Sequence, residues 1–329
     1  MSEATIPSPT AEPNGFWASK RRTENITRWT VFVILILGSI TMLMPVTWML
    51  ITSFKTRADV FAVPPPNSTF FQTLKFWIPI PPHPENYPQA WTVSGMYSGD
   101  SWSIFGIPIQ GITFTTYTLN TLFIAVFGCL GTTISSSVVA FAFARLRFPA
   151  RGPLFLLCLA TMMVPTQVTM IPTFILFKNM PWWLGGPWYN NFFPLVVPAF
   201  LGGGAYNIFL MRQFFMSIPY EMDEAAKIDG CTNFGVYWRI LLPLCKPALT
   251  TVAVFSFLWN WNDFLNPLIY LDSNSKKTLA LGLTNFVSLY GQDYQLLMAA
   301  SLIISLPIIV IFLAGQRYFI QGIATTGLK

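Results

Sequence analysis

The chain has 329 residues, of which 53% are hydrophobic and only 10% are charged, and its mean hydropathy is +0.53. Because an average soluble protein carries about 25% charged residues, this composition excludes a soluble globular enzyme and predicts a protein that crosses a membrane several times. The net charge of +6 does not indicate a nucleic-acid partner, since the 19 lysines and arginines are scattered along the chain rather than clustered.

Six stretches with few charges are long enough to cross a bilayer, which requires about 20 apolar residues in a helix. They lie at 30–52, 113–144, 152–177, 192–211, 247–271 and 294–316. We therefore predict an all-α fold, a polytopic membrane helix bundle with six transmembrane helices. The polar residues 1–29 form an N-terminal tail before an uncleaved first helix, residues 113–320 form the core of the bundle, and residues 321–329 form a second tail.

Basic residues predict the orientation of these helices. The tail 1–29 contains four of the 19 lysines and arginines, the turn at 145–151 three, the loop at 212–246 four, and the C-terminal end two. With six transmembrane helices all four segments lie on the same side, and cytoplasmic segments are enriched in lysine and arginine. We therefore expect both termini in the cytoplasm.

The segment 53–112 joins the first two predicted helices on the outer side. It is rich in proline and carries tryptophan at positions 77, 91 and 102. Proline at this density disfavours long helices. We expect this segment to form an extended, partly ordered lid over the outer face of the bundle.

The sequence of the cytoplasmic loop 212–246 predicts a short helix. Ser217 is a suitable N-cap residue, and Gly230 can end the helix in a left-handed turn. Three acidic residues fall early in this helix, where the helix dipole favours negative charge: Glu221, Asp223 and Glu224.

Four apolar residues of this loop recur at helical spacing and define one face: Ile218, Met222, Ala225 and Ala226. Such a face either docks on a partner outside the bilayer or packs back onto the bundle of its own chain. Amphipathicity alone does not distinguish these two interpretations.

The same loop contains an ordered set of acidic, small and apolar residues: Glu224-Ala225-Ala226, Asp229-Gly230, and then Ile240, Leu242 and Pro243. This set resembles the EAA loop of bacterial ABC-importer permeases, and the chain around it resembles the MalG-like carbohydrate permeases over nearly its full length. The flanking segments that carry this resemblance are 120–121, 140–149, 202–215, 259–264, 267–268 and 316–320.

In this family the loop forms a coupling helix that docks in a groove of a cytoplasmic ATPase, so the resemblance implies an ABC importer type I permease (MetI-like) fold. It assigns polar contacts to Glu224 and Asp229, close approach to Ala225 and Ala226, and the turn to Gly230. The full set of implied coupling residues is Glu221, Met222, Glu224, Ala225, Ala226, Asp229, Gly230, Ile240, Leu242 and Pro243. The implied partners are a second homologous permease subunit, two ABC ATPase subunits, an extracytoplasmic sugar-binding protein and the lipid bilayer.

The sequence contains neither the pattern GxxxxGK[ST] nor even the dipeptide Gly-Lys, so the chain has no phosphate-binding loop of that type. We expect no cofactor in this chain, and ATP with magnesium only in the partner ATPase. A single histidine, and four cysteines without a CxxC spacing, predict neither a catalytic residue nor a metal site.

Polar residues inside the predicted helices are candidates for a substrate path, because polar side chains are costly in a membrane. Asp263 lies with Asn260 and Asn262 toward the outer end of the fifth helix. These three residues either contact a sugar in an outward-facing cavity or form a hydrogen-bond cluster between helices. The same two interpretations apply to three further residues: Asn120, Gln167 and Asn207.

The resemblance thus implies a permease subunit of a bacterial ABC importer in the cytoplasmic membrane, with a carbohydrate, and specifically an oligosaccharide, as the expected solute. A glycerophosphodiester carried by the same machinery is the main alternative. An ion-coupled secondary transporter would require ionisable residues near the midplane and inverted repeats, whereas the sequence offers only the off-centre Asp263. An intramembrane enzyme would need converging catalytic groups, which His83 alone does not provide.

Overall fold

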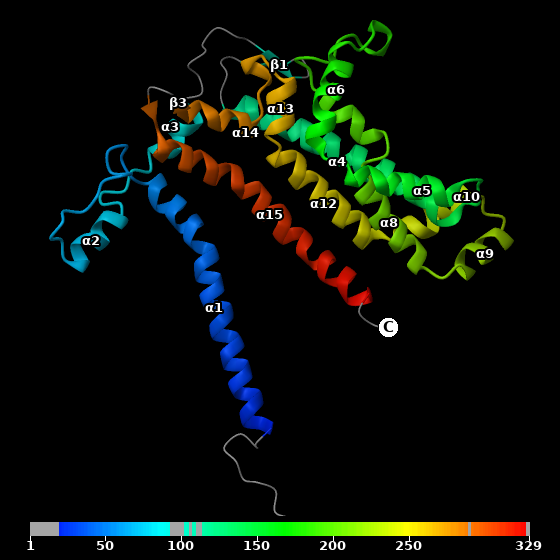
Figure 1. Cartoon of the computed structure of the whole chain (residues 1–329), viewed down its shortest axis with the longest axis horizontal. Helices are drawn as coiled ribbons and strands as arrows, with labels where there is room; N and C mark the ends of the chain where they lie inside the picture. The colour runs from blue at the N-terminus through cyan, green and yellow to red at the C-terminus, as the bar shows by residue number, and fades with distance from the viewer. Residues whose placement is uncertain (1–19, 93–101, 105–106, 110–113, 289–290, 327–329) are drawn as a thin grey trace, which may run out of the picture.

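The chain folds mainly into helices, and the computed structural model describes residues 20–92, 102–104, 107–109, 114–288 and 291–326 (Figure 1). The long helices are α1 (Lys20–Ser53), α4 (Phe114–Arg145), α8 (Ala205–Ser217), α12 (Lys246–Asn262) and α15 (Tyr294–Thr326). Among the described residues, four helical segments are long and apolar enough to cross a membrane, or up to six if each of two bent pairs is one span. This agrees with the predicted polytopic helix bundle.

Helix α4 is the centre of the bundle, with α8 and α12 packed along it (Figure 1). Small residues permit this close packing, as is common between membrane helices. A Cβ atom at Gly131 of α4 would lie 2.7 Å from the ring of Phe200, and a Cβ atom at Gly203 would lie 2.5 Å from the carbonyl oxygen of Thr132. At Gly131 an aromatic ring therefore packs directly against the backbone of α4, and at Gly203 the turn before α8 meets that backbone with its own.

Two clusters of buried side chains lie near the two ends of α4. The cluster near Arg145 contains Phe141, Met211, Phe215, Tyr237 and Leu241. The cluster near Phe114 contains Tyr117, Trp261, Phe286 and Leu296. The first cluster supports the loop that follows α8, and the second supports the connections at the opposite end of the bundle.

Helix α1 stands apart from this core. It meets α15 at one end and diverges from it toward the other (Figure 1). Every residue from Glu24 to Thr47 is exposed, and most of these residues are apolar. Such a surface is typical of a helix that faces lipid or another membrane subunit.

The structure has two sharp bends, one inside a predicted span and one just before another. The stretch predicted at 152–177 consists of Arg151–Met163 and α6 (Thr166–Lys178), which meet at an angle of 100°. The break lies at Val164 and Pro165, whose backbones are both extended. A second bend of 78° separates Asn233–Leu244 from α12, where proline lies within the first two residues of both α11 (Leu242–Leu244) and α12. Proline lacks the N–H that would continue the helical ladder.

The stretch predicted at 247–271 also ends early as a helix. Helix α12 stops at Asn262, because the backbone of Asp263 is extended, and a short helix α13 (Leu265–Tyr270) follows. The carboxylate of Asp263 accepts hydrogen bonds from the backbone N–H of Asn266, at 3.3 Å, and from the side-chain Nδ2 of the same residue, at 2.8 Å. Asp263 thus begins α13 instead of continuing α12.

The segment 53–112 contains more regular structure than an extended lid. It includes α2 (Phe70–Trp77), α3 (Asn86–Thr92) and the antiparallel strands β1 (Trp102–Ile104) and β2 (Ile107–Ile109). The side-chain Nδ2 of Asn86 donates to the carbonyl oxygens of Ser53 and Lys55, at 2.8 and 2.9 Å. These bonds hold α3 against the end of α1. The remaining residues of this segment, 93–101, 105–106 and 110–112, lie outside the described residues.

The ends of the predicted bundle also differ in detail. Helix α15 continues to Thr326, six residues into the tail predicted at 321–329. Helix α8 continues to Ser217, so the first residues of the loop predicted at 212–246 are helical. Within the described residues, a second antiparallel hairpin pairs β3 (Val287–Ser288) with β4 (Gly291–Gln292). The two short hairpins are additions to an otherwise helical fold.

Candidate functional site

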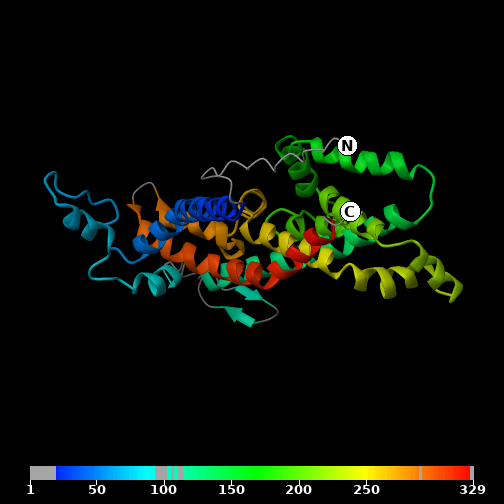
Figure 2. The same ribbon diagram turned by 90° about the horizontal axis from the view of Figure 1, so that it is seen from below.

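The loop that follows α8 forms a separate short helix, α9 (Glu221–Ile228), at the end of the molecule opposite α2 and α3 (Figures 1 and 2). The predicted N-cap is wrong: Ser217 is the last residue of α8, and its hydroxyl donates to the carbonyl oxygen of Phe214 at 2.8 Å. Tyr220 occupies the N-cap position of α9, without a side-chain capping bond. The three acidic residues do lie in the first turn, where the helix dipole favours them.

The C-terminal end of α9 is a left-handed turn at Gly230, whose φ is +84°. The backbone N–H of Gly230 donates to the carbonyl oxygen of Lys227 at 3.0 Å, and that of Cys231 donates to the carbonyl oxygen of Ala226 at 2.9 Å. These two bonds are the pattern of a Schellman motif. The predicted role of Gly230 in ending the helix is therefore present in the structure.

A buried ion pair attaches α9 to the end of α4. The guanidinium Nε of Arg145 lies 3.1 Å from Oδ2 of Asp223, and both side chains are less than one-tenth exposed. The guanidinium also donates through Nη2 to the carbonyl oxygen of Ile218 at 2.8 Å, and it lies over the ring of Tyr220. Burial raises the pKa of Asp223, while the charges of Arg145 and Lys227 oppose that rise.

The predicted apolar face of α9 is divided between two environments. Ala226 is buried with Asp223 against the bundle, whereas Met222 and Ala225 are exposed. Packing onto the bundle of its own chain therefore holds for Ala226, and does not hold for Met222 and Ala225. The exposed surface combines carboxylates with apolar side chains and includes Ile228, which is 86% exposed. Its residues are Glu221, Met222, Glu224, Ala225, Ile228 and Asp229.

A second helical segment follows the turn at Gly230. Helix α10 (Asn233–Val236) begins at Thr232, whose Oγ1 accepts a hydrogen bond from the backbone N–H of Gly235 at 3.2 Å. A π-helical turn, η5 (Tyr237–Leu241), continues it, and the hydroxyl of Tyr237 makes a buried hydrogen bond with that of Ser137 on α4 at 2.8 Å. Of the predicted coupling residues in this segment, Ile240 and Leu242 are half-buried and Pro243 is exposed.

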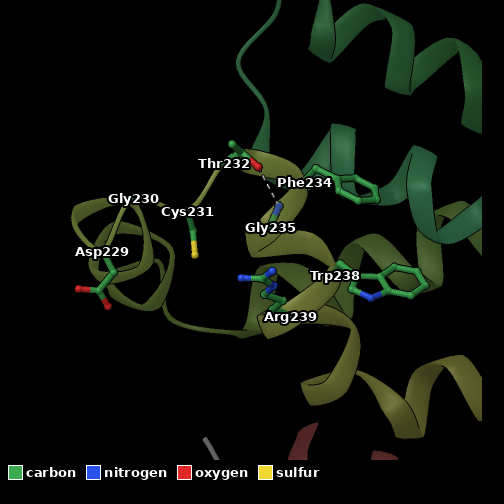
Figure 3. A pocket seen from close by; sticks show the side chains of 8 residues that line it. All are labelled: Asp229, Gly230, Cys231, Thr232, Phe234, Gly235, Trp238 and Arg239. Carbon is green, nitrogen blue, oxygen red and sulfur yellow. Dashed lines mark hydrogen bonds between the residues drawn. The ribbon is translucent and has the colours of Figure 1, made fainter.

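A pocket of about 420 Å³ lies between the end of α9 and this second segment (Figure 3). Cys231 and Arg239 point into the space between the two helical segments (Figure 3). The rings of Phe234 and Trp238 stack with centroids 6.3 Å apart, and both residues are largely exposed. The lining residues are Asp229, Gly230, Cys231, Thr232, Phe234, Gly235, Trp238 and Arg239.

The predicted substrate-path residues do not come together in one place. Asn120 is completely buried, and its Nδ2 donates to the carbonyl oxygens of Ser275 and Lys277, both at 2.9 Å. Gln167 is exposed on α6. The side chain of Asn207 donates to the carbonyl oxygen of Gly203 within its own helical turn, at 2.8 Å.

The polar residues at the end of α12 make local hydrogen bonds. Asn260 donates to the carbonyl oxygen of Ser256 at 2.7 Å, and the exposed Asn262 donates to that of Leu258 at 2.9 Å. Asp263 accepts from Asn266, as described above. These contacts organise the break between α12 and α13, and they correspond more closely to the hydrogen-bond interpretation than to a sugar-binding patch. Among the described residues, no group of three or more His, Cys, Asp or Glu is placed to hold a metal ion.

Two features of this site are not evident from the sequence: the pairing of Asp223 with Arg145, and the position of Trp238. Asp223 was predicted only as an acid near a helix dipole, although it is the buried partner of Arg145. A basic residue at the end of an otherwise charge-free helix, followed by a loop rich in acids, is a signal that could have suggested this pair. For Trp238 the sequence offers no comparable signal, because a single tryptophan in a loop forms no recognisable pattern.

Comparisons with known proteins agree with this arrangement. The model of the family described as "Binding-protein-dependent transport system inner membrane component" matches residues 131–325. The chain is 31% identical over 309 residues to the "Probable ABC transporter permease protein YurM" of Bacillus subtilis (strain 168), covering 94% of this chain and 91% of that protein. It is 33% identical over 245 residues to the "Arabinooligosaccharides transport system permease protein AraQ" of Halalkalibacterium halodurans, covering 74% and 79%.

The fold is similar to that of a solved transporter. A structure titled "Crystal structure of a bacterial ABC transporter involved in the import of the acidic polysaccharide alginate" contains a chain that superimposes with a TM-score of 0.70. The two sequences are 23% identical, and the match covers 93% of this chain and 99% of the other. This likeness supports the fold of the helical bundle.

Proposed function

The chain belongs to the family of binding-protein-dependent transport system inner membrane components, and we propose that it is the permease subunit of an ATP-driven importer for an oligosaccharide. The oligosaccharide is supported by the resemblance to carbohydrate permeases and by the name of the similar AraQ protein. ATP hydrolysis is assigned to a partner subunit, because the sequence has no phosphate-binding loop.

The observation that carries this proposal is the exposed surface of α9. Its two glutamates, Glu221 and Glu224, flank Met222 and Ala225, so the surface offers both charge and apolar contact. Ala225 has only a methyl group, which allows another chain to approach the helix backbone closely. We assign this surface to the groove of a cytoplasmic ATPase. The complete assembly would contain two such ATPases, a second homologous permease and an extracytoplasmic sugar-binding protein.

The mechanism follows from how α9 is held. The ion pair between Arg145 and Asp223 joins α9 to α4, and α4 in turn packs against α8 and α12. When the ATPases close and displace α9, the displacement reaches the bundle through these contacts. The cavity then opens outward to receive the sugar, and ATP hydrolysis restores the inward-facing state.

The orientation supports this assignment. In the proposed arrangement both termini and the α9 loop are cytoplasmic, because the lysines and arginines are concentrated on that side. Of the six predicted path residues, Gln167 and Asn262 are exposed. Asn262 makes a hydrogen bond within α12, so Gln167 is the one that we retain as a proposed substrate contact.

The test is affinity purification of the tagged chain from its native membrane, with the co-purifying proteins identified by mass spectrometry. We expect an ATPase, a second permease and a sugar-binding protein. Glu224→Lys should lower both the yield of ATPase and the uptake of labelled oligosaccharide, because it reverses a charge on the docking surface. The matched control is Glu24→Lys, which reverses another exposed carboxylate on α1, away from this surface.

Recovery of the chain alone, in mild detergent and with intact membranes, would overturn the assembly and favour a self-sufficient carrier. Normal uptake by Glu224→Lys would overturn the role of α9. Recovery of the full assembly with uptake of a glycerophosphodiester, and of no sugar, would overturn the proposed substrate while leaving the machinery in place.

A further inference from the structure

The segment 61–80, here called the aromatic arm, extends away from the bundle. Figures 1 and 2 both show α2, which lies within this arm, at one extreme of the molecule beside the C-terminal end of α1. The ring of Phe61 at the base of the arm meets that of Tyr294 at the start of α15, with centroids 5.0 Å apart. The arm is thus attached at its base and projects outward.

Large apolar side chains of the arm are exposed. Val63 is 82% exposed, Phe70 74%, Phe71 75% and Ile80 73%, and Trp77 and Ile78 are each about half exposed. Phe70 and Trp77 are seven residues apart in α2 and lie on the same side of the helix, next to Phe71. Soluble surfaces rarely expose so many neighbouring apolar side chains.

The charge of the arm restricts what covers it. Residues 60–82 include one charged residue, Lys75, and no acidic residue. Tryptophan is enriched at the boundary between lipid headgroups and acyl chains, and helices that lie in this boundary bury tryptophan and phenylalanine side chains there. The composition therefore favours a lipid surface as the occupant.

The position of the arm supports the same occupant. Helix α1, whose residues 24–47 are exposed and largely apolar, ends at Ser53, and the arm begins eight residues later. The chain therefore leaves the bilayer just before the arm starts. In Figure 1, α2 lies on the same side of the molecule as the C-terminal end of α1.

We propose that the aromatic arm is an interfacial anchor that lies on the outer leaflet of the membrane, with Phe70, Phe71 and Trp77 inserted at the level of the lipid headgroups. This inference rests on the membrane orientation in the proposed function, but not on the identity of the solute or of the ATPase. The arm fixes the outer end of α1 at a defined depth. It is therefore a membrane contact and not a lid over the bundle.

The test uses two measurements on the assembled transporter. First, cells that express Phe71→Cys are freed of their outer membrane or cell wall, and the cytoplasmic membrane is kept intact. These cells are then treated with a charged maleimide that does not cross membranes. The control is Gln89→Cys on α3, an exposed position beside the buried Ala90. Labelling of the unsubstituted protein measures the contribution of its four native cysteines. Phe71→Cys should label about tenfold more slowly than Gln89→Cys, because a thiol in an apolar environment ionises poorly.

Second, the unsubstituted transporter is placed in lipid nanodiscs containing a lipid with a photoreactive group near its headgroup. After illumination, peptide mass spectrometry should locate lipid adducts on residues 61–80 and on α1, but not on α3. Ile80→Cys repeats the labelling experiment at a second exposed position if Phe71→Cys does not accumulate.

Slow labelling of Phe71→Cys together with lipid adducts on the arm would support the anchor. Rapid labelling without lipid adducts would overturn it in favour of an arm surrounded by water. Slow labelling without lipid adducts would also overturn it, because another protein would then cover the arm. If that protection disappears when the extracytoplasmic binding protein is removed, the binding protein is the partner. The proposed transport function would survive either of these failures.

Discussion

The guanidinium Nε of Arg145 lies 3.1 Å from the carboxylate Oδ2 of Asp223, joining the last residue of α4 to the first turn of α9. Both side chains are almost completely buried. The contact fixes the direction of α9 relative to the bundle, so that Asp223 and Ala226 face inward and Glu221, Met222 and Glu224 face outward. The surface assigned to the ATPase is thus defined by an ion pair on the opposite side of the same helix.

Removing one partner of this pair should destabilise the loop. Arg145→Gln leaves the charge of Asp223 buried without its cation, a change that costs about 3–5 kcal/mol in typical buried pairs. We expect a lower unfolding temperature of the purified complex and faster proteolysis between α8 and α10. Arg239→Gln is the control, because Arg239 is exposed in the same loop. The double variant Arg145→Gln/Asp223→Asn should recover part of the loss, and an unchanged Arg145→Gln would contradict the role of the pair.

The same pair predicts a dependence of stability on pH. Burial raises the pKa of Asp223 above its ordinary value, against the opposing charges of Arg145 and Lys227. A carboxyl group whose folded-state pKa is raised contributes stability below its unfolded-state pKa and loses that contribution as pH rises through the folded-state pKa. The stability of the native chain relative to Asp223→Asn should therefore decrease as pH increases from about 4. The unfolding temperatures of the native chain and of Asp223→Asn, measured over this pH range, give the difference in stability. If the two unfolding temperatures change with pH in parallel, the prediction is contradicted.

Gly230 is predicted to be required for its backbone conformation alone. Its φ is +84°, and a Cβ atom added there would meet nothing within 4 Å. Gly230→Ala should therefore cost about 1–2 kcal/mol, the penalty of a left-handed residue with a side chain, and should reduce coupled ATPase activity. Gly230→Asn should be milder, because asparagine tolerates this region. Gly235→Ala, where the nearest atom to the new Cβ lies at 3.6 Å, is the matched control and should retain activity.

Gly203 is predicted to be required for close packing. Its φ is +67°, and an added Cβ atom would lie 2.5 Å from the carbonyl oxygen of Thr132, so α8 would have to move away from α4. The neighbouring Gly202 also has a positive φ, of +114°, but nothing lies within 4 Å of its added Cβ atom. Gly203→Ala should lower the unfolding temperature of the complex more than Gly202→Ala does. Equal effects would mean that backbone conformation, and not contact with α4, sets the requirement.

Asn120 is predicted to stabilise the outer connection and not to bind substrate. Its side chain donates to the carbonyl oxygens of Ser275 and Lys277, and a typical hydrogen bond contributes about 0.5–1.5 kcal/mol to stability. Asn120→Ala should lower the unfolding temperature while leaving the substrate concentration for half-maximal uptake unchanged. A large rise in that concentration, with unchanged stability, would return Asn120 to the substrate path.

Much of the fold is visible in the sequence, because a bilayer imposes long apolar helices. The residues at 113–144 correspond closely to α4, and the apolar stretch at 294–316 lies within α15. The breaks are less visible. Asp263 interrupts an apolar stretch, yet only its hydrogen bonds to Asn266 show that the helix ends there. The helices α2 and α3 of the segment 53–112 are also hard to predict from the sequence. They are short and lie among many prolines, so their helical periodicity is not apparent.

Local chemistry makes three features of this protein readable without a structure: the membrane-spanning composition, the short helix at α9 and the turn at Gly230. A left-handed turn requires little more than a glycine at the end of a helix. Which side of α9 is exposed depends on the packing of the whole chain, because helical periodicity defines faces but not what packs against them. Arg145 sets the orientation of α9, because its side chain forms an ion pair with Asp223, which lies far away in the sequence. An ion pair between residues far apart in sequence exists only after the helices that carry them have packed.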